Sequence, residues 1–254
     1  LHNVLRSKLL RTLFKISGTP VSFINKGRSE KKKLTSLTNK IFQPLKTTHQ
    51  RYADVFLQLG FNISLKNASL KEKEVLSKHL KTLTHYIANE TAIGIAPFAA
   101  HEEKKYPLEF MEEVISELAK DYKILLFGGG QSEIEALTRL SKKHKNTFCI
   151  AGKVGLKDEL TIISNLSAMI SMDSGNGHFS ALYGIPTITI WGATHPYAGF
   201  APFQQQNNCI CADRSQFPLL PTSIYGNKTI PGYTKVMYSI SPKTIVDKVL
   251  SILK

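Results

Sequence analysis

The sequence predicts an α/β protein with a parallel sheet in its second part and an incomplete domain of the same class in its first. From Thr91 onward, apolar runs of strand length alternate with amphipathic runs of helix length. Such alternation is typical of βαβ units, whose helices cover both faces of a parallel sheet. Before Thr91 the alternation is irregular, and lysine and arginine dominate the charges. The two parts are therefore expected to form separate domains, at 1–86 and 87–254.

Five strands and four intervening helices are expected after Thr91. The strands are predicted at 92–98, 123–127, 147–150, 168–172 and 187–191. The helices are predicted at 108–120, 132–144, 156–166 and 177–183. In the first helix Phe110, Val114 and Leu118 belong to one apolar stripe, as packing against a core requires. Ser132 is expected to cap the second helix, because its hydroxyl can accept a hydrogen bond from the first turn.

Residues 1–90 give a less regular pattern. Helices are expected at 7–16 and 49–59, and Gly60 is a plausible helix end because glycine adopts left-handed backbone angles easily. A strand is expected at 21–24, a loop or frayed helix at 26–40, and a charged connecting helix at 68–82. These elements amount to the back half of a domain.

Positive charge is concentrated in the first part of the chain. Residues 1–90 carry 17 Lys and Arg against 5 Asp and Glu, whereas residues 91–254 carry 16 against 14. A basic surface indicates an anionic partner, which could be nucleic acid, a phospholipid surface or an acidic substrate. Nucleic acid is disfavoured, because Lys31-Lys32-Lys33 has no interleaved aromatic residues and no binding motif surrounds it. A solvated basic surface without a partner is the alternative.

The composition disfavours several classes of protein. Hydrophobic residues make up 42% of the chain and charged residues 20%, which allows a packed core and argues against a disordered polyelectrolyte. No apolar run approaches the ~20 residues that span a bilayer, so an integral membrane protein is not expected. Three cysteines cannot pair completely, which favours a reducing compartment. Cys209-Ile210-Cys211 with His195 lacks zinc-site spacing, so no metal is expected.

The residues that follow the predicted strands indicate a binding edge. In a parallel α/β sheet, ligands bind beyond the carboxyl ends of the strands, and all five ends here are followed by small, polar or charged residues. The sharpest motif is Asp173-Ser174-Gly175-Asn176-Gly177-His178, between a strand and a helix. Its glycines would admit a phosphate to the helix N-terminus, and Lys104 and Lys153 would add charge. The set suits a diphosphate; the alternative is a turn in which Asp173 caps the helix and His178 packs.

A carboxylate follows the second predicted strand. The run from Gly128 to Glu133 resembles a dinucleotide-binding loop only weakly, because the third glycine of that fingerprint is missing. Glu133 at the start of the helix could hold ribose hydroxyls, or it could be a partner of the helix dipole. Both interpretations stay open.

Five segments carry a family resemblance: Lys104-Lys105-Tyr106-Pro107, Gly129 to Glu133, Gly152 to Leu156, Asp173 to Pro186 and Trp191-Gly192. In order and spacing they resemble the ADP-heptose:lipopolysaccharide heptosyltransferases of glycosyltransferase family 9. The resemblance extends from about Ile93 to Pro202 and includes a terminal helix after Ser241-Pro242. It implies a GT-B-like fold, with a Rossmann-like donor-binding domain at 87–254 and a partial Rossmann-like acceptor-side domain at 1–86.

The resemblance implies roles for eight residues. Those at the donor are Lys104 at the phosphates, Glu133 near the ribose, Val154 at the adenine, Asp173 near the sugar hydroxyls, and Ser174, Gly175 and His178 in the phosphate-binding turn. Arg6 is carried over as an acceptor-binding residue. The general base is expected upstream of Leu1, so the chain looks like a fragment with little turnover of its own. Ala99 and Ala100 depart from the family, in which hydroxyl residues are common there, and Tyr106 replaces a frequent tryptophan.

The reaction that the resemblance implies is the inverting transfer of heptose from ADP-heptose to the lipopolysaccharide inner core. It requires no cofactor besides the ADP-sugar substrate. The alternatives are a GT-B enzyme with another nucleotide sugar and a donor-binding module without catalysis. An acidic acceptor at an anionic membrane would explain the basic first part, so a cytoplasmic location, peripheral at the inner membrane, is expected.

Overall fold

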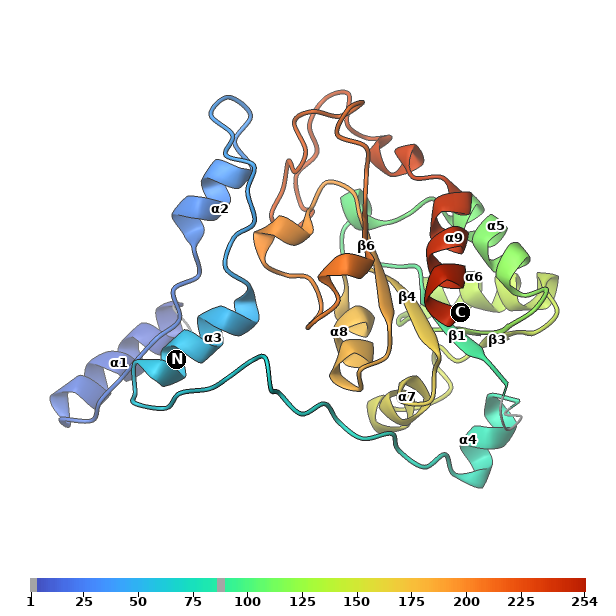
Figure 1. The fold of residues 1–254 in the computed structure, drawn as a ribbon, viewed down its shortest axis with the longest axis horizontal. Helices are drawn as coiled ribbons and strands as arrows, with labels where there is room; N and C mark the ends of the chain where they lie inside the picture. Colours follow the sequence, from blue (N-terminus) through green and yellow to red (C-terminus); the bar gives the residue numbers. More distant parts are fainter. Residues whose placement is uncertain (1–3, 86–89) are drawn as a thin grey trace. The chain divides into compact units, whose positions relative to one another are not determined.

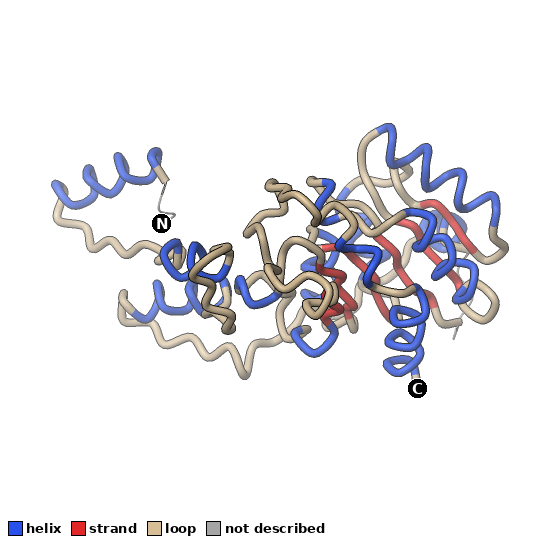
Figure 2. Tube along the Cα trace, turned by 90° about the horizontal axis from the view of Figure 1, so that it is seen from above, coloured by secondary structure: helices blue, strands red, loops and turns tan. Residues whose placement is uncertain are grey.

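The computed structural model describes residues 4–85 and 90–254, and the chain divides into two compact units (Figure 1). Unit 1 consists of Leu1–Ser69 and Tyr197–Phe200, and unit 2 consists of Leu70–Pro196 and Ala201–Lys254. The domain boundary predicted between residues 86 and 87 lies outside the described residues. All strands formed by the described residues belong to unit 2 (Figure 2).

Unit 2 is built on a six-stranded parallel sheet. Its strands are β1 (Ala92–Ala96), β2 (Lys123–Leu126), β3 (Thr147–Cys149), β4 (Ala168–Met172), β5 (Thr187–Trp191) and β6 (Cys209–Cys211). They lie in the order β3-β2-β1-β4-β5-β6, and every neighbouring pair is parallel. The chain runs outward from β1 to β3 and then crosses back to form β4 on the other side of β1. The strands β1 and β4 therefore form the topological switch point of the sheet, the usual place for a ligand.

Helices cover both faces of this sheet. Figure 1 shows α5 (Leu108–Leu118), α6 (Gln131–Lys143) and α9 (Pro242–Leu253) on one side of the strands, and α7 (Leu156–Ile163) and α8 (Gly175–Leu182) on the other. The first core contains Met111, Leu137 and Val249. The second contains Ile162 and, from α4 (Lys78–Leu83), Leu80. Two apolar cores on opposite faces are what buried strands between two helix layers require.

Residues 70–77, which precede α4 and are called the strap below, link α7 to the C-terminal end of α8. The Glu74 carboxylate accepts hydrogen bonds from the Tyr183 hydroxyl at 2.6 Å and the Thr161 hydroxyl at 2.7 Å. Hydrogen bonds from Tyr183 and Thr161 lower the pKa of Glu74 to about 2, so the carboxylate is ionised at neutral pH. The helix predicted at 68–82 is therefore wrong in its first half: residues 70–77 bond to other parts of unit 2, and only α4 is helical.

Unit 1 holds three helices in its described part, α1 (Leu5–Ile16), α2 (Arg28–Leu34) and α3 (Thr48–Leu57). The buried Arg51 of α3 donates to the Glu30 carboxylate at 2.6 Å and to the carbonyl oxygens of Asn25 and Lys46 at 3.1 Å. The strand predicted at 21–24 is wrong. That segment has no strand beside it among the described residues, and a strand forms only as part of a ladder.

Other differences from the predicted elements have local causes. The strand β1 ends at Ala96, earlier than predicted, because Pro97 has no N–H to donate to a ladder. Helix α6 begins at Gln131 with Gly130 as its N-cap, so Ser132 is inside the helix and does not cap it. The sequence did not predict β6, which has only three residues. Among the described residues, none forms a helix long and apolar enough to cross a membrane.

Candidate functional site

The centre of the site lies where β1 and β4 end side by side. Ala96 of β1 pairs with Ser171 of β4, so the segments that follow these strands leave the sheet together. The short 3₁₀-helix η1 (Glu102–Lys104) follows β1. Lys104 Nζ lies 2.7 Å from Asp173 Oδ2 and donates to the Asp173 carbonyl oxygen at 2.9 Å. The two side chains are only 14% and 9% exposed, so a largely buried ion pair occupies the switch point.

Helix α8 begins at the same edge of the sheet. It starts at Gly175, two residues before the predicted start, with Ser174 as an extended N-cap. Within the described part of the chain, the Ser174 side chain accepts no hydrogen bond from the first turn. The N–H groups of that turn are therefore available to an anion. A Cβ on Gly177 would lie 2.9 Å from Ser171 Oγ and 3.2 Å from Thr189 Cγ2, so glycine allows the helix to lie close to the sheet.

His178 adds a hydrogen-bond donor to this turn. Its side chain reaches the surface, yet removal of surrounding water lowers its pKa below the usual value. Asp173 raises the same pKa and Lys104 lowers it, but both effects are smaller than that of burial. The imidazole is therefore mainly neutral at pH 7 and keeps one N–H donor. Asn176, in the same turn, donates to Glu159 Oε1 of α7 at 3.1 Å, which ties the turn to its neighbouring helix.

Glu133 lies over the glycine loop that follows β2. Its Oε2 accepts a hydrogen bond from the Gly129 N–H at 2.8 Å. A Cβ on Gly128 would lie 3.1 Å from the same oxygen. The side chain is half-buried and belongs to the first turn of α6. The carboxylate is thus held by its own loop through Oε2.

Val154 belongs to the loop that follows β3. Gly152 in this loop has φ +74°, and a Cβ there would lie 2.6 Å from Ile134 Cδ1. Val154 packs, partly buried, against the second core. Lys153 is exposed. The loop is therefore held close to α6, with the backbone around Val154 at the rim of the sheet.

The structure brings seven of the eight predicted site residues to one edge of unit 2. Val154, Glu133, Lys104 and Asp173 follow β3, β2, β1 and β4, which are consecutive neighbours in the sheet. Ser174, Gly175 and His178 continue from Asp173 into α8. Arg6 lies in α1 of unit 1, with an exposed side chain.

Sequence reasoning missed the loop at residues 222–229, which lies against Lys104. A Cβ on Gly226 would lie 2.4 Å from Lys104 Cγ. The local signal was the dipeptide Gly226-Asn227, which is common in turns. A turn signal does not reveal which side chain the turn will contact.

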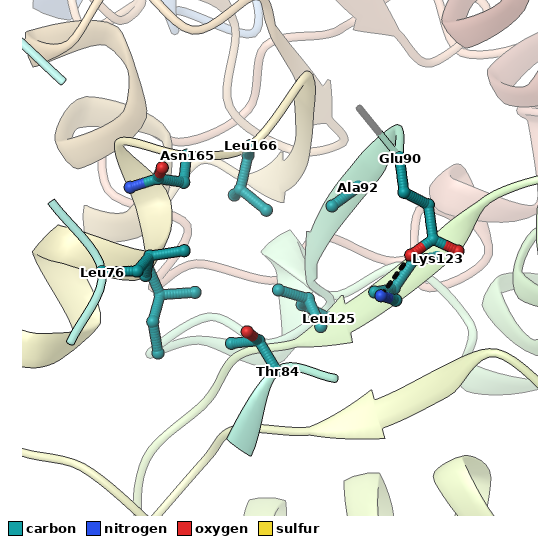
Figure 3. A pocket seen from close by; sticks show the side chains of 9 residues that line it. Leu76, Thr84, Glu90, Ala92, Lys123, Leu125, Asn165 and Leu166 are labelled. Carbon is teal, nitrogen blue, oxygen red and sulfur yellow. Dashed lines mark ion pairs between the residues drawn. The ribbon is translucent and has the colours of Figure 1, made fainter. Parts of the chain in front are cut away.

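A small cavity lies at the opposite end of the strands and is separate from this site. Figure 3 shows its lining, which includes Leu76, Ala92 and Leu125, with the Glu90–Lys123 ion pair at one side. Ala92 and Lys123 are the first residues of β1 and β2, so the cavity lies at the amino ends of the strands. It has room for about one water molecule.

The cysteines and His195 have buried or half-buried side chains. Burial raises the pKa of the Cys211 thiol to about 12, and Cys149, Cys209 and Cys211 are free. Burial, with a smaller effect of Arg214, lowers the pKa of His195 to about 4. Across residues 4–85 and 90–254, no group of three or more His, Cys, Asp or Glu side chains is placed to hold a metal ion. The environments of these side chains are those of packed residues.

Comparisons with known proteins find similar chains among the heptosyltransferases. Lipooligosaccharide heptosyltransferase 2 of Campylobacter jejuni is 24% identical over 169 residues, which are 64% of this chain and 51% of that protein. A family 9 glycosyl transferase from Veillonella parvula aligns with a TM-score of 0.63 and 20% identity, over 86% of this chain and 62% of that one. An E. coli heptosyltransferase solved with ADP aligns with a TM-score of 0.57 and 18% identity, over 84% and 60%.

The likeness to these solved structures shows that the chain has their GT-B-like α/β fold. The chain spans about half the length of the Campylobacter relative. A sequence model of glycosyltransferase family 9 (heptosyltransferase) matches residues 2–224, and the chain therefore belongs to that family.

Proposed function

We propose that this protein transfers heptose, with inversion, from ADP-heptose to the inner core of lipopolysaccharide, and that unit 2 binds the donor. Membership of family 9 supports this activity, as does the E. coli neighbour that was solved with ADP. The observation that carries the proposal is the position of Lys104. Its ammonium lies at the switch point of the sheet, beside Asp173 and close to the start of α8 in the chain.

The order of the strands supports an extended donor. The groups follow one another as an ADP-sugar does: Val154 for adenine, Glu133 for ribose, Lys104 with the α8 turn for the diphosphate, and Asp173 for the sugar. Neighbouring strands lie about 4.8 Å apart, so the four strand ends span about 14 Å. An extended nucleotide diphosphate can lie across such a row with each part beside its partner.

The charges suit departure of ADP. As the bond between the sugar and the diphosphate breaks, negative charge grows on the diphosphate oxygens. Lys104, the N–H groups of the α8 turn and the neutral His178 are all hydrogen-bond donors that a diphosphate in this region could meet. Donors aimed at growing charge stabilise the transition state more than the ground state, which is the binding that accelerates a reaction.

Calorimetry with ADP, UDP and GDP tests the proposal. ADP is expected to bind best, and Lys104→Ala is expected to weaken ADP about 10- to 100-fold, since a hydrogen bond to a charged group contributes about 1.5–3 kcal/mol. Lys243→Ala, on the exposed side of α9, is the control and should bind ADP like the wild type. Equal affinity of both variants would contradict the assignment of Lys104.

Calorimetry and a transfer assay together separate the competing functions. Tighter binding of UDP or GDP than of ADP would favour another nucleotide sugar as the donor. Binding of ADP without transfer from ADP-heptose to a lipopolysaccharide core acceptor would favour a donor-binding module without catalysis. Transfer by the 254-residue chain would establish the complete activity.

We also propose that unit 1 contacts an anionic membrane surface on the cytoplasmic side. The helix α1 has basic residues and no acidic ones, and its apolar side chains Leu9, Leu13 and Ile16 are exposed. A basic helix with an exposed apolar face suits a surface of anionic lipids. Co-sedimentation with phosphatidylglycerol vesicles should fall as salt is added, and should be weak with phosphatidylcholine. Binding that ignores both salt and lipid charge would argue against this contact.

A further inference from the structure

We propose that Gly226 is a positioning residue for the donor: its backbone, in the loop at residues 222–229, holds the Lys104 side chain in the conformation that places its ammonium beside Asp173. This inference rests on the proposed donor site of unit 2. Gly226 lies beyond residues 2–224, the stretch that matches the family model. Its role follows from the contacts of this chain alone.

The contact between Gly226 and Lys104 is close along the whole stem. A Cβ on Gly226 would lie 2.4 Å from Lys104 Cγ, 2.8 Å from Cδ and 3.2 Å from Cε. The first two distances are below 3.0 Å, a separation that real Cβ atoms essentially never reach with an atom elsewhere in the chain. The Lys104 ammonium is already held by Asp173, at 2.7 Å from Oδ2 and 2.9 Å from the carbonyl oxygen. A methyl group on Gly226 would therefore have to displace the stem, which runs between the η1 backbone and the paired ammonium.

The loop that carries Gly226 is anchored to the end of β5. The backbone N–H groups of Thr222 and Ser223 both donate to the Ala193 carbonyl oxygen, at 3.0 and 3.1 Å. Ser223 Oγ then accepts the Gly226 N–H at 2.9 Å and donates to Asn227 Oδ1 at 3.3 Å. The turn is therefore closed by its own serine and fixed to the sheet.

The same loop is anchored to the segment that carries Lys104. Ala193 N–H donates to the Glu103 carbonyl oxygen at 3.2 Å, and Thr229 Oγ1 donates to Glu103 Oε1 at 2.7 Å. Lys104 is the next residue after Glu103. The β5 end, the loop and η1 thus form one connected set, with the Lys104 stem enclosed between its members. Gly226 is the position in this set where the backbone approaches the stem directly.

A matched pair of glycines makes this testable. Gly226 has φ +76° and Gly232 has φ +80°, so replacement by alanine introduces the same backbone strain at both. A Cβ on Gly232 meets no atom within 4 Å, in contrast to the contact at Gly226. The difference between Gly226→Ala and Gly232→Ala therefore isolates the contact with Lys104.

The experiment measures ADP affinity by calorimetry for the wild type, Gly226→Ala, Gly232→Ala, Lys104→Ala and the double variant Lys104→Ala/Gly226→Ala. We expect Gly226→Ala to weaken ADP about tenfold and Gly232→Ala to change it less than about twofold, since loss of one charged hydrogen bond corresponds to roughly tenfold. In the Lys104→Ala background, Gly226→Ala should have no further effect. Equal effects of the two glycine variants, or an unchanged effect of Gly226→Ala without Lys104, would overturn the proposal.

Urea unfolding of the same five proteins separates this inference from the proposed function. If the wild type does not bind ADP, the proposed function fails, but the contact is still tested. Gly226→Ala should lower the unfolding midpoint more than Gly232→Ala, and the excess should vanish when Lys104 is alanine, because the crowded stem is gone. If Gly226→Ala alone does not fold, folding of the double variant supports the contact. An excess that persists without Lys104 would refute it.

Discussion

Removal of the Lys104 ammonium should destabilise unit 2, because it leaves a carboxylate without its partner. Lys104→Met keeps a long apolar side chain but removes the charge that lies 2.7 Å from Asp173 Oδ2. The side chains are 14% and 9% exposed, so water can compensate only part of the loss. Breaking a buried ion pair from one side costs about 3–5 kcal/mol. The remaining exposure places the expected loss near the lower end, at about 3 kcal/mol.

The matched variants identify the cause of that loss. Lys104→Met/Asp173→Asn removes both charges and should recover at least half of the lost stability, because no unpaired charge remains in the interior. Lys153→Met makes the same substitution at an exposed position that follows β3, two strands away from β1. It should change the free energy of unfolding by less than about 0.5 kcal/mol.

Trp191 provides the assay. It is the single tryptophan of the chain, and it lies buried at the end of β5. Its fluorescence during urea unfolding therefore reports on unit 2. The reasoning is wrong if Lys104→Met unfolds at the same midpoint as Lys153→Met, or if Asp173→Asn fails to restore stability to Lys104→Met.

Three further predictions have directions that the structure determines. Gly177→Ala would place a methyl group 2.9 Å from Ser171 Oγ, and this overpacking should lower the free energy of unfolding by about 1–3 kcal/mol. Gly175→Ala, whose nearest contact would be at 3.8 Å, should lower it less in the same urea titration. Because the pKa of His195 is lowered to about 4 by burial and then by Arg214, its contribution to stability is complete above pH 6.5 and is lost as the pH falls toward 4. That loss is about 3 kcal/mol, and His195→Gln should flatten it in acid unfolding curves. Glu74→Gln removes the ionised acceptor that binds α7 to the end of α8 and should lower the thermal midpoint; an unchanged midpoint would show that the strap adds nothing to stability.

The interior of unit 2 was predictable because hydrophobic runs and their spacing determine buried strands and helices. The strands β4 and β5 begin and end where the sequence predicts, since each is a continuous run of buried residues flanked by polar turns. The strap at residues 70–77 was not predictable in the same way. Its structure depends on Glu74 meeting Tyr183 and Thr161, which lie far away in the chain. A charged segment of that composition looks helical when its partners are unknown.

The gathering of the site residues at the carboxyl ends of the strands was predictable for a different reason. Parallel strands share the direction of their carboxyl ends, so residues that follow each strand must gather on one side whatever their exact loop conformation. That geometry is enough to bring Lys104 near Asp173, although the two strands are separated by β2 and β3 along the chain. It did not require any knowledge of side-chain contacts.

The exact positions of the side chains at this end of the sheet could not be predicted, because they depend on loops that meet only after folding. The charge of Lys104 is visible in the sequence, but its direction depends on Gly226, which approaches the stem from a loop fixed to β5 and to Glu103. A positive φ and the absence of a side chain are both needed at that point, and glycine meets both needs at once. The sequence shows glycine at many turns, and only the contact distances distinguish Gly226 from Gly232. For this reason the comparison of these two glycines tests the site more directly than the removal of Lys104 itself.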